Sequence, residues 1–285
     1  MTFQRNVVKL VSSSDGEPVA VHDFGGHGAP LLLGHGNGLN SGMWAPVLPL
    51  LVEHFSCYGV DLRGHGRAHA VSEGHSVDRE HFAADVLAAV DAIGAPVRYA
   101  GHSLGGAAAL YAAMARPSAF ASLWLYEPVV VPTGFVREDH AGPELLIKAS
   151  RRRRLDFDSI DDAVDRFSSK PPFFGCDSFA VRGYVEIGSY ATEDGIRLSC
   201  TGENEARVFE TVSELDFGRL ADIAVPSLVV SGGSVDELNA LPPRMAPLVS
   251  EALGNARWEQ HRWLSHFGPM EAPRTIARSI IEHMA

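Results

Sequence analysis

The stretch Gly101-His102-Ser103-Leu104-Gly105 decides how this sequence is interpreted, because of what lies on either side of it. Residues 96–100 are typical of a short strand, and the alanine-rich residues 106–115 are typical of a helix. A sharp turn between them leaves no room for a side chain at its first or last position, which explains the two glycines. The serine is then expected in strained backbone geometry, with its hydroxyl at the positive end of the helix. This placement predicts a nucleophile rather than an idle serine in a structural turn.

A serine nucleophile needs a base, and a residue far along the chain is the candidate for it. A serine hydroxyl is a weak nucleophile, so it requires a base, and the base requires an orienting acid. His266 lies between the strand predicted at 256–261 and the helix predicted at 273–284. In catalytic triads whose serine lies on such a strand-to-helix turn, the acid and then the histidine follow the serine along the chain. His266 fits this order, and its loop is expected to face the serine turn. His266 is therefore predicted to be the base; the alternative is a histidine on a surface loop.

Two acidic residues are candidates for the orienting role. Glu127 ends the strand that follows the serine helix, and Asp236 follows the strand predicted at 227–231. A loop after either strand can present a carboxylate to the histidine. Counted from the end of the strand at 227–231, the usual spacing to the acid would place it at Val235. Asp236 comes one residue late, which gives Glu127 a slight advantage. The structural alternatives are a hydrogen-bonding residue for Glu127 and a helix cap or surface turn for Asp236.

Two backbone N–H groups are predicted to hold the negative charge that develops on a carbonyl oxygen under attack. One is the N–H of Leu104, directly after the nucleophile. The other is the N–H of Asn37, in the turn His35-Gly36-Asn37-Gly38 that follows the strand at 31–33. The flanking glycines allow close approach, and the Asn37 side chain is a further candidate for substrate contact. The alternative interpretation is a plain turn.

Composition and charge limit the other classes of function. The chain has 285 residues and a net charge of −11, which argues against general nucleic-acid or anionic-membrane binding. Three widely spaced cysteines, Cys57, Cys176 and Cys200, fit neither a disulfide framework nor a metal site. The N-terminal residues lack the apolar core of a signal peptide, and no apolar run reaches membrane-spanning length. We therefore expect a cytoplasmic monomer or homodimer without metal or cofactor.

Two clusters of charged or metal-ligating residues suggest additional sites. Residues 151–154 are four consecutive arginines, which would suit a phosphate or another anionic substrate. Aspartates follow at once, so a solvated helix face is the favoured interpretation. Four histidines also lie close in sequence, but their spacing is loose and no carboxylate cage accompanies them, which disfavours a metal site. They are His65, His69, His75 and His81.

The alternation of elements predicts one core domain with an insertion. Residues 7–24 are typical of an antiparallel hairpin, and short apolar strands then alternate with helices expected at 43–53, 78–93, 243–253 and 273–284. This order favours an α/β fold with a mostly parallel sheet and helices on both faces. From 133 to 217 the alternation stops. We therefore assign 1–132 and 218–285 to the core and 133–217 to an insertion.

Together, four motifs resemble the α/β-hydrolase fold superfamily over nearly the whole chain. They are His35-Gly36-Asn37-Gly38, Asp61-Leu62-Arg63-Gly64-His65-Gly66, Gly101-His102-Ser103-Leu104-Gly105 and His266-Phe267-Gly268-Pro269-Met270-Glu271. The resemblance implies a mostly parallel eight-stranded sheet with a helical cap, 133–217, inserted after the sixth strand. Ser103 stands where dehalogenases and epoxide hydrolases of the superfamily use an aspartate, which implies the serine branch. Some dehalogenases have a glutamate matching Glu127, which supports that residue as the acid.

The resemblance implies hydrolysis of a small to medium carboxylic ester, as in the carboxylesterase-like enzymes of class EC 3.1.1. Ser103, His266 and either Glu127 or Asp236 would act through an acyl-enzyme. One alternative is hydrolysis of a C–C bond in a ring-cleavage product, in which His266 would also assist tautomerisation. A catalytically silent ligand receptor is another. Aromatic residues of the insertion could line a pocket, although internal packing is favoured; they are Phe173, Phe174, Phe179, Tyr184 and Tyr190.

Overall fold

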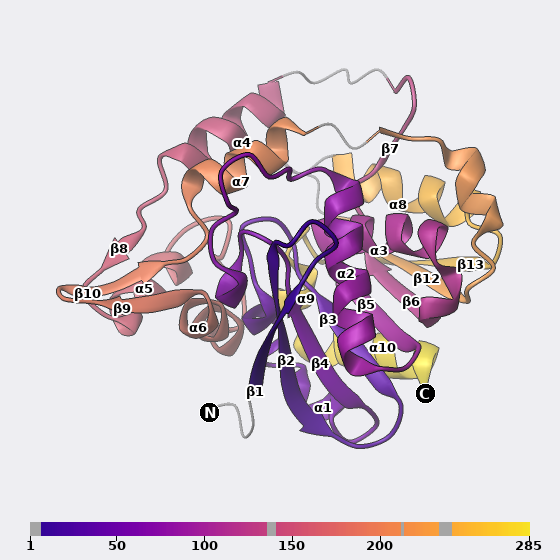
Figure 1. Cartoon of the computed structure of the whole chain (residues 1–285), viewed down its shortest axis with the longest axis horizontal. Coiled ribbons are helices and arrows are strands. Elements are labelled where there is room, and N and C mark those ends of the chain that lie inside the picture. Colours follow the sequence, from indigo (N-terminus) through magenta and orange to yellow (C-terminus); the bar gives the residue numbers. More distant parts are fainter. Residues whose placement is uncertain (1–6, 136–140, 212–213, 234–240) are drawn as a thin grey trace.

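The computed structural model describes residues 7–135, 141–211, 214–233 and 241–285, and it is built around an eight-stranded sheet (Figure 1). The first three strands in spatial order pair antiparallel, and the remaining strands pair parallel. The α/β-hydrolase architecture expected from the sequence is thereby confirmed. The spatial order is β1 (Val7–Ser12), β2 (Pro18–Gly26), β4 (Ser56–Asp61), β3 (Pro30–Gly34), β5 (Val97–His102), β6 (Phe120–Tyr126), β12 (Ser227–Gly232) and β13 (Ala256–His261).

Buried apolar side chains form a separate core on each face of the sheet. Successive strand residues point to opposite faces, so Leu32 joins one core while Leu31 and Leu33 join the other. The first core packs against α2 (Arg79–Ile93), α3 (Leu104–Ala115) and α8 (Leu241–Ala252). The second packs against α1 (Leu48–Leu51), α9 (Gly268–Glu271) and α10 (Pro273–Met284).

Local signals in the sequence explain where the long helices begin and end. The side chain of Asp78 accepts a hydrogen bond from the N–H of His81 and caps α2, which ends at Gly94 in the left-handed conformation. The helix expected at 43–53 is wrong. The structure has a 3₁₀ helix, η1 (Ser41–Trp44), and then the four-residue α1. Pro46 lies between the two helices, and Pro49 lies in the first turn of α1, where a proline is tolerated. In the interior of one continuous helix, each would lack the required N–H and clash with the preceding turn.

The segment between β6 and β12 lies to one side of the sheet and is only partly helical (Figure 1). It holds a three-stranded antiparallel sheet as well as helices, whereas the resemblance implies a helical cap. Near its two ends, β7 (Val131–Pro132) pairs with β11 (Glu214–Leu215), so the chain leaves and returns at one place. The other elements are α4 (Ala141–Arg151), β8 (Asp156–Phe157), α5 (Ile160–Ser168), α6 (Ser178–Ile187), β9 (Ser189–Thr192), β10 (Gly195–Leu198) and α7 (Gly202–Glu210).

Close backbone contact and polar bonds hold this segment to the rest of the molecule. α6 meets η1 where Gly42 and Gly183 face each other, and a methyl group added to Gly42 would lie 2.0 Å from the carbonyl oxygen of Gly183. The amide of Asn40 donates to the carbonyl of Tyr184, and that of Asn204 donates to the carbonyl of Gly64. Apolar residues of the segment join the second core. The segment is therefore packed onto the loops that follow β3 and β4.

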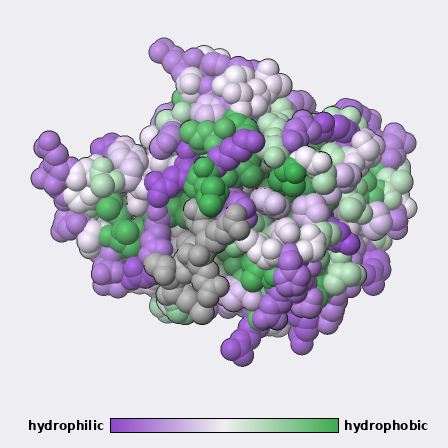
Figure 2. All heavy atoms as spheres, turned by 60° about the horizontal axis from the view of Figure 1, so that its bottom comes forward, coloured by the Kyte–Doolittle hydropathy of each residue, from purple (hydrophilic) through white to green (hydrophobic). Residues whose placement is uncertain are grey.

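The surface is mixed in character. In the view of Figure 2, hydrophilic residues surround smaller hydrophobic areas. β1 is an edge strand, and its Val7 and Leu10 are more than half exposed. Within the described ranges, no helix is long and apolar enough to cross a membrane. The three cysteines, all within those ranges, are unpaired.

Candidate active site

Ser103 occupies a strained turn between β5 and α3. Its φ of 53° and ψ of −111° lie outside the regions that L-residues favour, which costs about 1–3 kcal/mol. A methyl group on Gly105 would lie 2.7 Å from the carbonyl carbon of Gly34, and one on Gly101 would lie 2.9 Å from the nitrogen of Gly106. Side chains at both positions would therefore collide with backbone. The glycines are required by the turn, as the sequence predicts.

A chain of two hydrogen bonds links three of the candidate residues. Nε2 of His266 lies 3.0 Å from Oγ of Ser103, and Nδ1 of His266 lies 2.6 Å from Oε2 of Glu127. A carboxylate only accepts, so Nδ1 carries the proton and Nε2 is free to accept from the serine hydroxyl. The structure thus brings together residues 103, 127 and 266 in the arrangement that general-base activation of a serine requires.

Glu127 is held rigidly at the end of β6. Its backbone has a φ of 45°, and its N–H donates to the carbonyl of Val230 on the neighbouring strand. The second carboxylate oxygen accepts a hydrogen bond of 2.8 Å from the N–H of Gly232, and the residue is completely buried. Both oxygens are therefore committed, one to β12 and one to His266. Asp236, the other candidate acid, lies outside the described residues.

The turn after β3 lies directly against Ser103. A methyl group on Gly36 would come within 3.3 Å of Cβ of Ser103, and the N–H of Gly105 donates to the carbonyl of His35. Among the residues that the structure describes, none accepts a hydrogen bond from the N–H of Asn37 or of Leu104. Two free donors thus lie on the two segments that meet at the serine.

The Asn37 side chain is engaged differently from the expected substrate contact. Its amide nitrogen donates to the carbonyl of Glu205 on α7, over 3.0 Å. Its amide oxygen lies 3.3 Å from Nε2 of His65. The side chain therefore ties the turn to the segment between β6 and β12.

Comparison with known proteins shows the family to which the chain belongs. The model of the alpha/beta hydrolase fold family matches residues 29–170. The non-heme haloperoxidase of Rhodococcus erythropolis is 30% identical over 271 residues, which span 90% of this chain and 92% of that protein. The chain belongs to the α/β-hydrolase fold family. The bifunctional esterase/perhydrolase of Acinetobacter calcoaceticus is 38% identical over 104 residues, 35% of this chain and 37% of that protein. The crystal structure of an E-2-(acetamidomethylene)succinate hydrolase matches with a TM-score of 0.78 at 19% identity, covering 98% of this chain and 99% of that one.

Two buried histidines of this α/β-hydrolase shape the turn that carries Asn37. In His35, Nδ1 donates to the carbonyl of Gly36 and Nε2 accepts from the N–H of Leu62. In His65, Nε2 accepts from the N–H of Gly38. Burial, and next the unfavourable interaction with a second imidazolium at His65, lower the pKa of His35 to about 3, and burial also lowers the pKa of His65. Both rings are therefore neutral and structural, and no group of three metal-ligating side chains forms within the described ranges.

His102 is a residue of the site that the sequence analysis did not single out. Its Nε2 donates to the backbone carbonyl of His266 over 2.8 Å, and the two rings lie 4.8 Å apart. Burial and the neighbouring His266 hold the pKa of His102 well below its usual value, so the ring stays neutral. The hydroxyl of Tyr126 donates to the carbonyl of Ser265. These two bonds fix the loop of the hydrolase that presents His266, although the pentapeptide motif gives no signal for this role.

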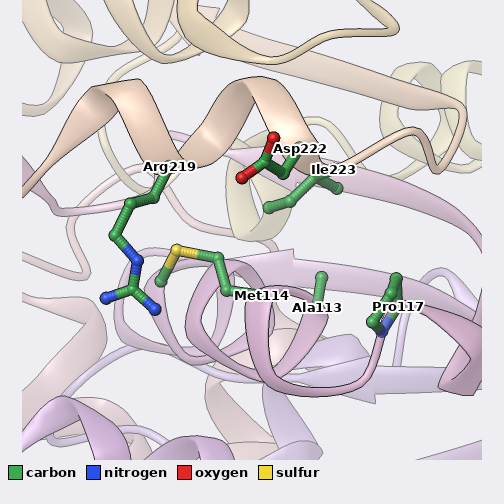
Figure 3. A pocket seen from close by; sticks show the side chains of 6 residues that line it. All are labelled: Ala113, Met114, Pro117, Arg219, Asp222 and Ile223. Atoms are coloured by element: carbon green, nitrogen blue, oxygen red, sulfur yellow. The ribbon is translucent and has the colours of Figure 1, made fainter.

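The site of this hydrolase is enclosed. Ser103 is only 7% exposed, and Phe173 of the segment between β6 and β12 packs against Phe267, the residue after His266. The hollow shown in Figure 3 is a separate feature between α3 and η4 (Phe217–Asp222), lined by Met114 and Arg219 among others. It lies at the far end of α3, about 15 Å from the serine by helix geometry. It takes no part in the arrangement around Ser103.

Proposed function

We propose that this protein is a serine hydrolase that cleaves a small to medium carboxylic ester through an acyl-enzyme intermediate. The observation that carries the proposal is the hydrogen-bonded chain from Ser103 through His266 to Glu127. Family membership and a relative named as an esterase/perhydrolase support the same class of reaction. Glu127 is the proposed acid, because both of its oxygens already have the bonds that this role needs.

In the proposed mechanism, Oγ of Ser103 attacks the ester carbonyl while Nε2 of His266 takes the hydroxyl proton. Glu127 stabilises the imidazolium that forms. The N–H groups of Asn37 and Leu104 hold the oxyanion, and each such donor is worth about 10²–10³ in rate. The ester C–O bond then breaks, and His266 passes its proton to the leaving alcohol. Water attacks the acyl-enzyme by the reverse sequence, which releases the acid and restores Ser103.

We further propose that residues 133–217 act as a cap over this site. The pairing of β7 with β11 closes the ends of the segment, and its bonds to the loops after β3 and β4 fix it beside Ser103. A cap in this position would exclude water during acyl transfer and shape the substrate pocket. The boundaries of the cap follow from where the alternation of strands and helices stops.

The test is hydrolysis of p-nitrophenyl esters from acetate to laurate by the wild type and Ser103→Ala, together with labelling by a fluorophosphonate. We expect turnover to fall on the order of 10⁶-fold in the variant. Labelling should disappear with it, and the chain-length profile of the wild type would give the size of the pocket. Labelling that survives in Ser103→Ala would show that another residue is the nucleophile.

A second candidate is acyl transfer to hydrogen peroxide instead of water. The relative named as a non-heme haloperoxidase matches 90% of this chain, which favours testing it. Peroxide would attack the same acyl-enzyme, giving a peracid and free Ser103. Peracid formation from an ester and peroxide, absent in Ser103→Ala, would support it. Turnover of a ring-fission diketone without turnover of any ester would instead support C–C bond hydrolysis.

A further inference from the structure

The four consecutive arginines do not share one environment. Arg151 and Arg154 are exposed and pair with acidic side chains at the surface, and Arg152 is exposed as well. These three agree with the expected solvated face. Arg153 differs: its side chain is only 15% exposed, and its Nη2 lies 2.5 Å from the equally buried carboxylate of Glu205. One arginine of the run therefore turns into the molecule.

Arg153 points to the turn that carries a proposed oxyanion donor. A methyl group added to Gly38 would lie 3.3 Å from Nη1 of Arg153. Glu205, its ion-pair partner, accepts the Asn37 side chain through its backbone carbonyl. Gly38 is two residues from Gly36, so at most about 7.6 Å separates their Cα atoms. Since Gly36 lies against Ser103, the serine and the guanidinium border the same turn, one at Gly36 and the other at Gly38.

A continuous row of aromatic rings connects the base with this arginine. The rings of Phe267 and Phe173 lie 5.7 Å apart, and those of Phe173 and Tyr184 lie 5.1 Å apart. The hydroxyl of Tyr184 lies 3.4 Å from Nη1 of Arg153. Phe267 directly follows His266. Phe173 and Tyr184 are buried in the second core, and a short acyl chain that lay along the row would meet a cation at its far end.

The guanidinium has donors to spare. An arginine has five N–H groups in a fixed fork. Glu205 and the sulfur of Cys200 lie at Nη2, and the hydroxyl of Tyr184 lies at Nη1. Nε is buried and has no hydrogen-bond partner in the part of the chain that the structure describes. A buried, unpaired donor is costly, and an incoming carboxylate would remove that cost. The planar guanidinium also matches the geometry of a carboxylate better than that of an anion with a single charged atom.

We propose that Arg153 binds a carboxylate at the end of the substrate's acyl chain, so that the protein prefers monoesters of short dicarboxylic acids to neutral esters. This inference rests on the proposed ester hydrolysis at Ser103. Glu205 holds Arg153 in place when no substrate is bound and competes with the substrate carboxylate for the guanidinium. Arg153 is thereby a specificity-determining residue rather than part of the reacting centre.

The test compares the monomethyl and dimethyl esters of succinic, glutaric and adipic acids, with product acid measured by chromatography. For at least one chain length, the wild type should show a higher kcat/KM for the monoester. In Arg153→Met, the ratio of monoester to diester kcat/KM should fall about ten- to hundredfold, the range of a charge-assisted hydrogen bond. Arg153→Lys should retain part of the preference. Arg152→Met is the matched control, because it removes an exposed arginine beside the site, and it should keep the wild-type ratio.

Glu205→Gln tests whether Arg153 binds the substrate's anion or serves only as the partner of Glu205 in a structural ion pair. Removing the competing charge should increase the monoester preference, whereas loss of a structural pair would lower both activities together. In Arg153→Met, the buried carboxylate of Glu205 loses its partner, so Arg153→Met/Glu205→Gln provides the folded comparison. The double variant should show the same low ratio as Arg153→Met. If the double variant kept the wild-type ratio of monoester to diester kcat/KM, the proposal would be overturned.

A binding measurement keeps this proposal separable from ester hydrolysis. In Ser103→Ala, calorimetric titration with glutarate or adipate should show binding that Arg153→Met weakens at least tenfold, by the same charge-assisted bond. If the wild type cleaves no ester and its Ser103 takes no fluorophosphonate, the proposed function fails, while dicarboxylate binding still decides the role of Arg153. If neutral esters are cleaved but no dicarboxylate binds and no monoester is preferred, only the role of Arg153 fails.

Discussion

At the scale of single residues, the identity of the acid has the clearest consequence. Glu127 and Asp236 are 109 positions apart in the sequence. Each follows a strand, and a loop after either strand could present a carboxylate to the same histidine. In the structure, Glu127 bonds both His266 and the backbone of β12. A carboxylate fixed from both sides can hold the imidazole in one tautomer and stabilise its charged form.

Glu127→Gln keeps the shape of the side chain and removes the charge. The expected result is a fall in kcat for p-nitrophenyl butyrate of about 10³–10⁴-fold, because the imidazolium loses its counter-charge and its tautomer is no longer enforced. Asp236→Asn is the matched comparison and should keep kcat close to that of the wild type. The reverse outcome, with Asp236→Asn inactive and Glu127→Gln active, would assign the role to Asp236.

At the scale of elements, the contact between α6 and η1 controls how closely the proposed cap lies over the site. Gly42 and Gly183 bring two backbones together without intervening side chains. The same η1 precedes the short α1, and it follows the turn that carries Asn37. Any displacement of α6 would therefore be transmitted toward Tyr184, on the same helix, and toward the aromatic row.

Gly42→Ala tests this contact. The added methyl group would overlap the carbonyl of Gly183, so α6 must shift, at a cost of about 1–3 kcal/mol in the free energy of unfolding. We expect a lower Tm and faster proteolysis within residues 133–217, both measured at matched protein concentration. Gly218→Ala is the control, because its methyl group would meet no backbone atom. The nearest atom is a side-chain carboxylate oxygen of Asp216, at 3.1 Å. Equal effects from both changes would argue against a special role for the α6 contact.

At the scale of the whole molecule, buried neutral histidines connect stability with pH. His35, His65 and His102 all have a pKa lowered by burial, to about 3 for His35. Between the unfolded value of 6.5 and the folded value, the unfolded chain binds more protons than the folded one. Stability therefore rises with pH across this window, and it is lost as the pH falls below about 6.5.

The free energy of unfolding, measured with urea, should therefore be lower at pH 5 than at pH 7. His35 alone should account for about 2 kcal/mol of that difference. His35→Gln has no titrating ring, so its difference between the two pH values should shrink by this amount, even if the variant is less stable at both. A pH difference equal to that of the wild type would mean that His35 does not contribute through its protonation.

Local patterns in the sequence are enough to predict the sheet, the serine turn and the place of His266 on the loop between the last strand and the last helix. The strand predicted at 256–261 and the helix at 273–284 match β13 and α10. The glycines at 101 and 105 predict the turn, since no other residue fits there. The helix expected at 43–53 failed because two prolines outweighed an apolar spacing of helical period.

Which side chains meet depends instead on the packing of elements that are distant in sequence. Glu127 and His266 are 139 residues apart, and no local pattern states that β12 binds the second oxygen of that carboxylate. In the sequence, Arg153 cannot be told apart from the three arginines beside it. It turns inward because it pairs with Glu205 on α7 and lies next to Gly38. Contacts of this kind depend on how distant elements pack together, whereas periodicity and turn chemistry depend only on neighbours along the chain.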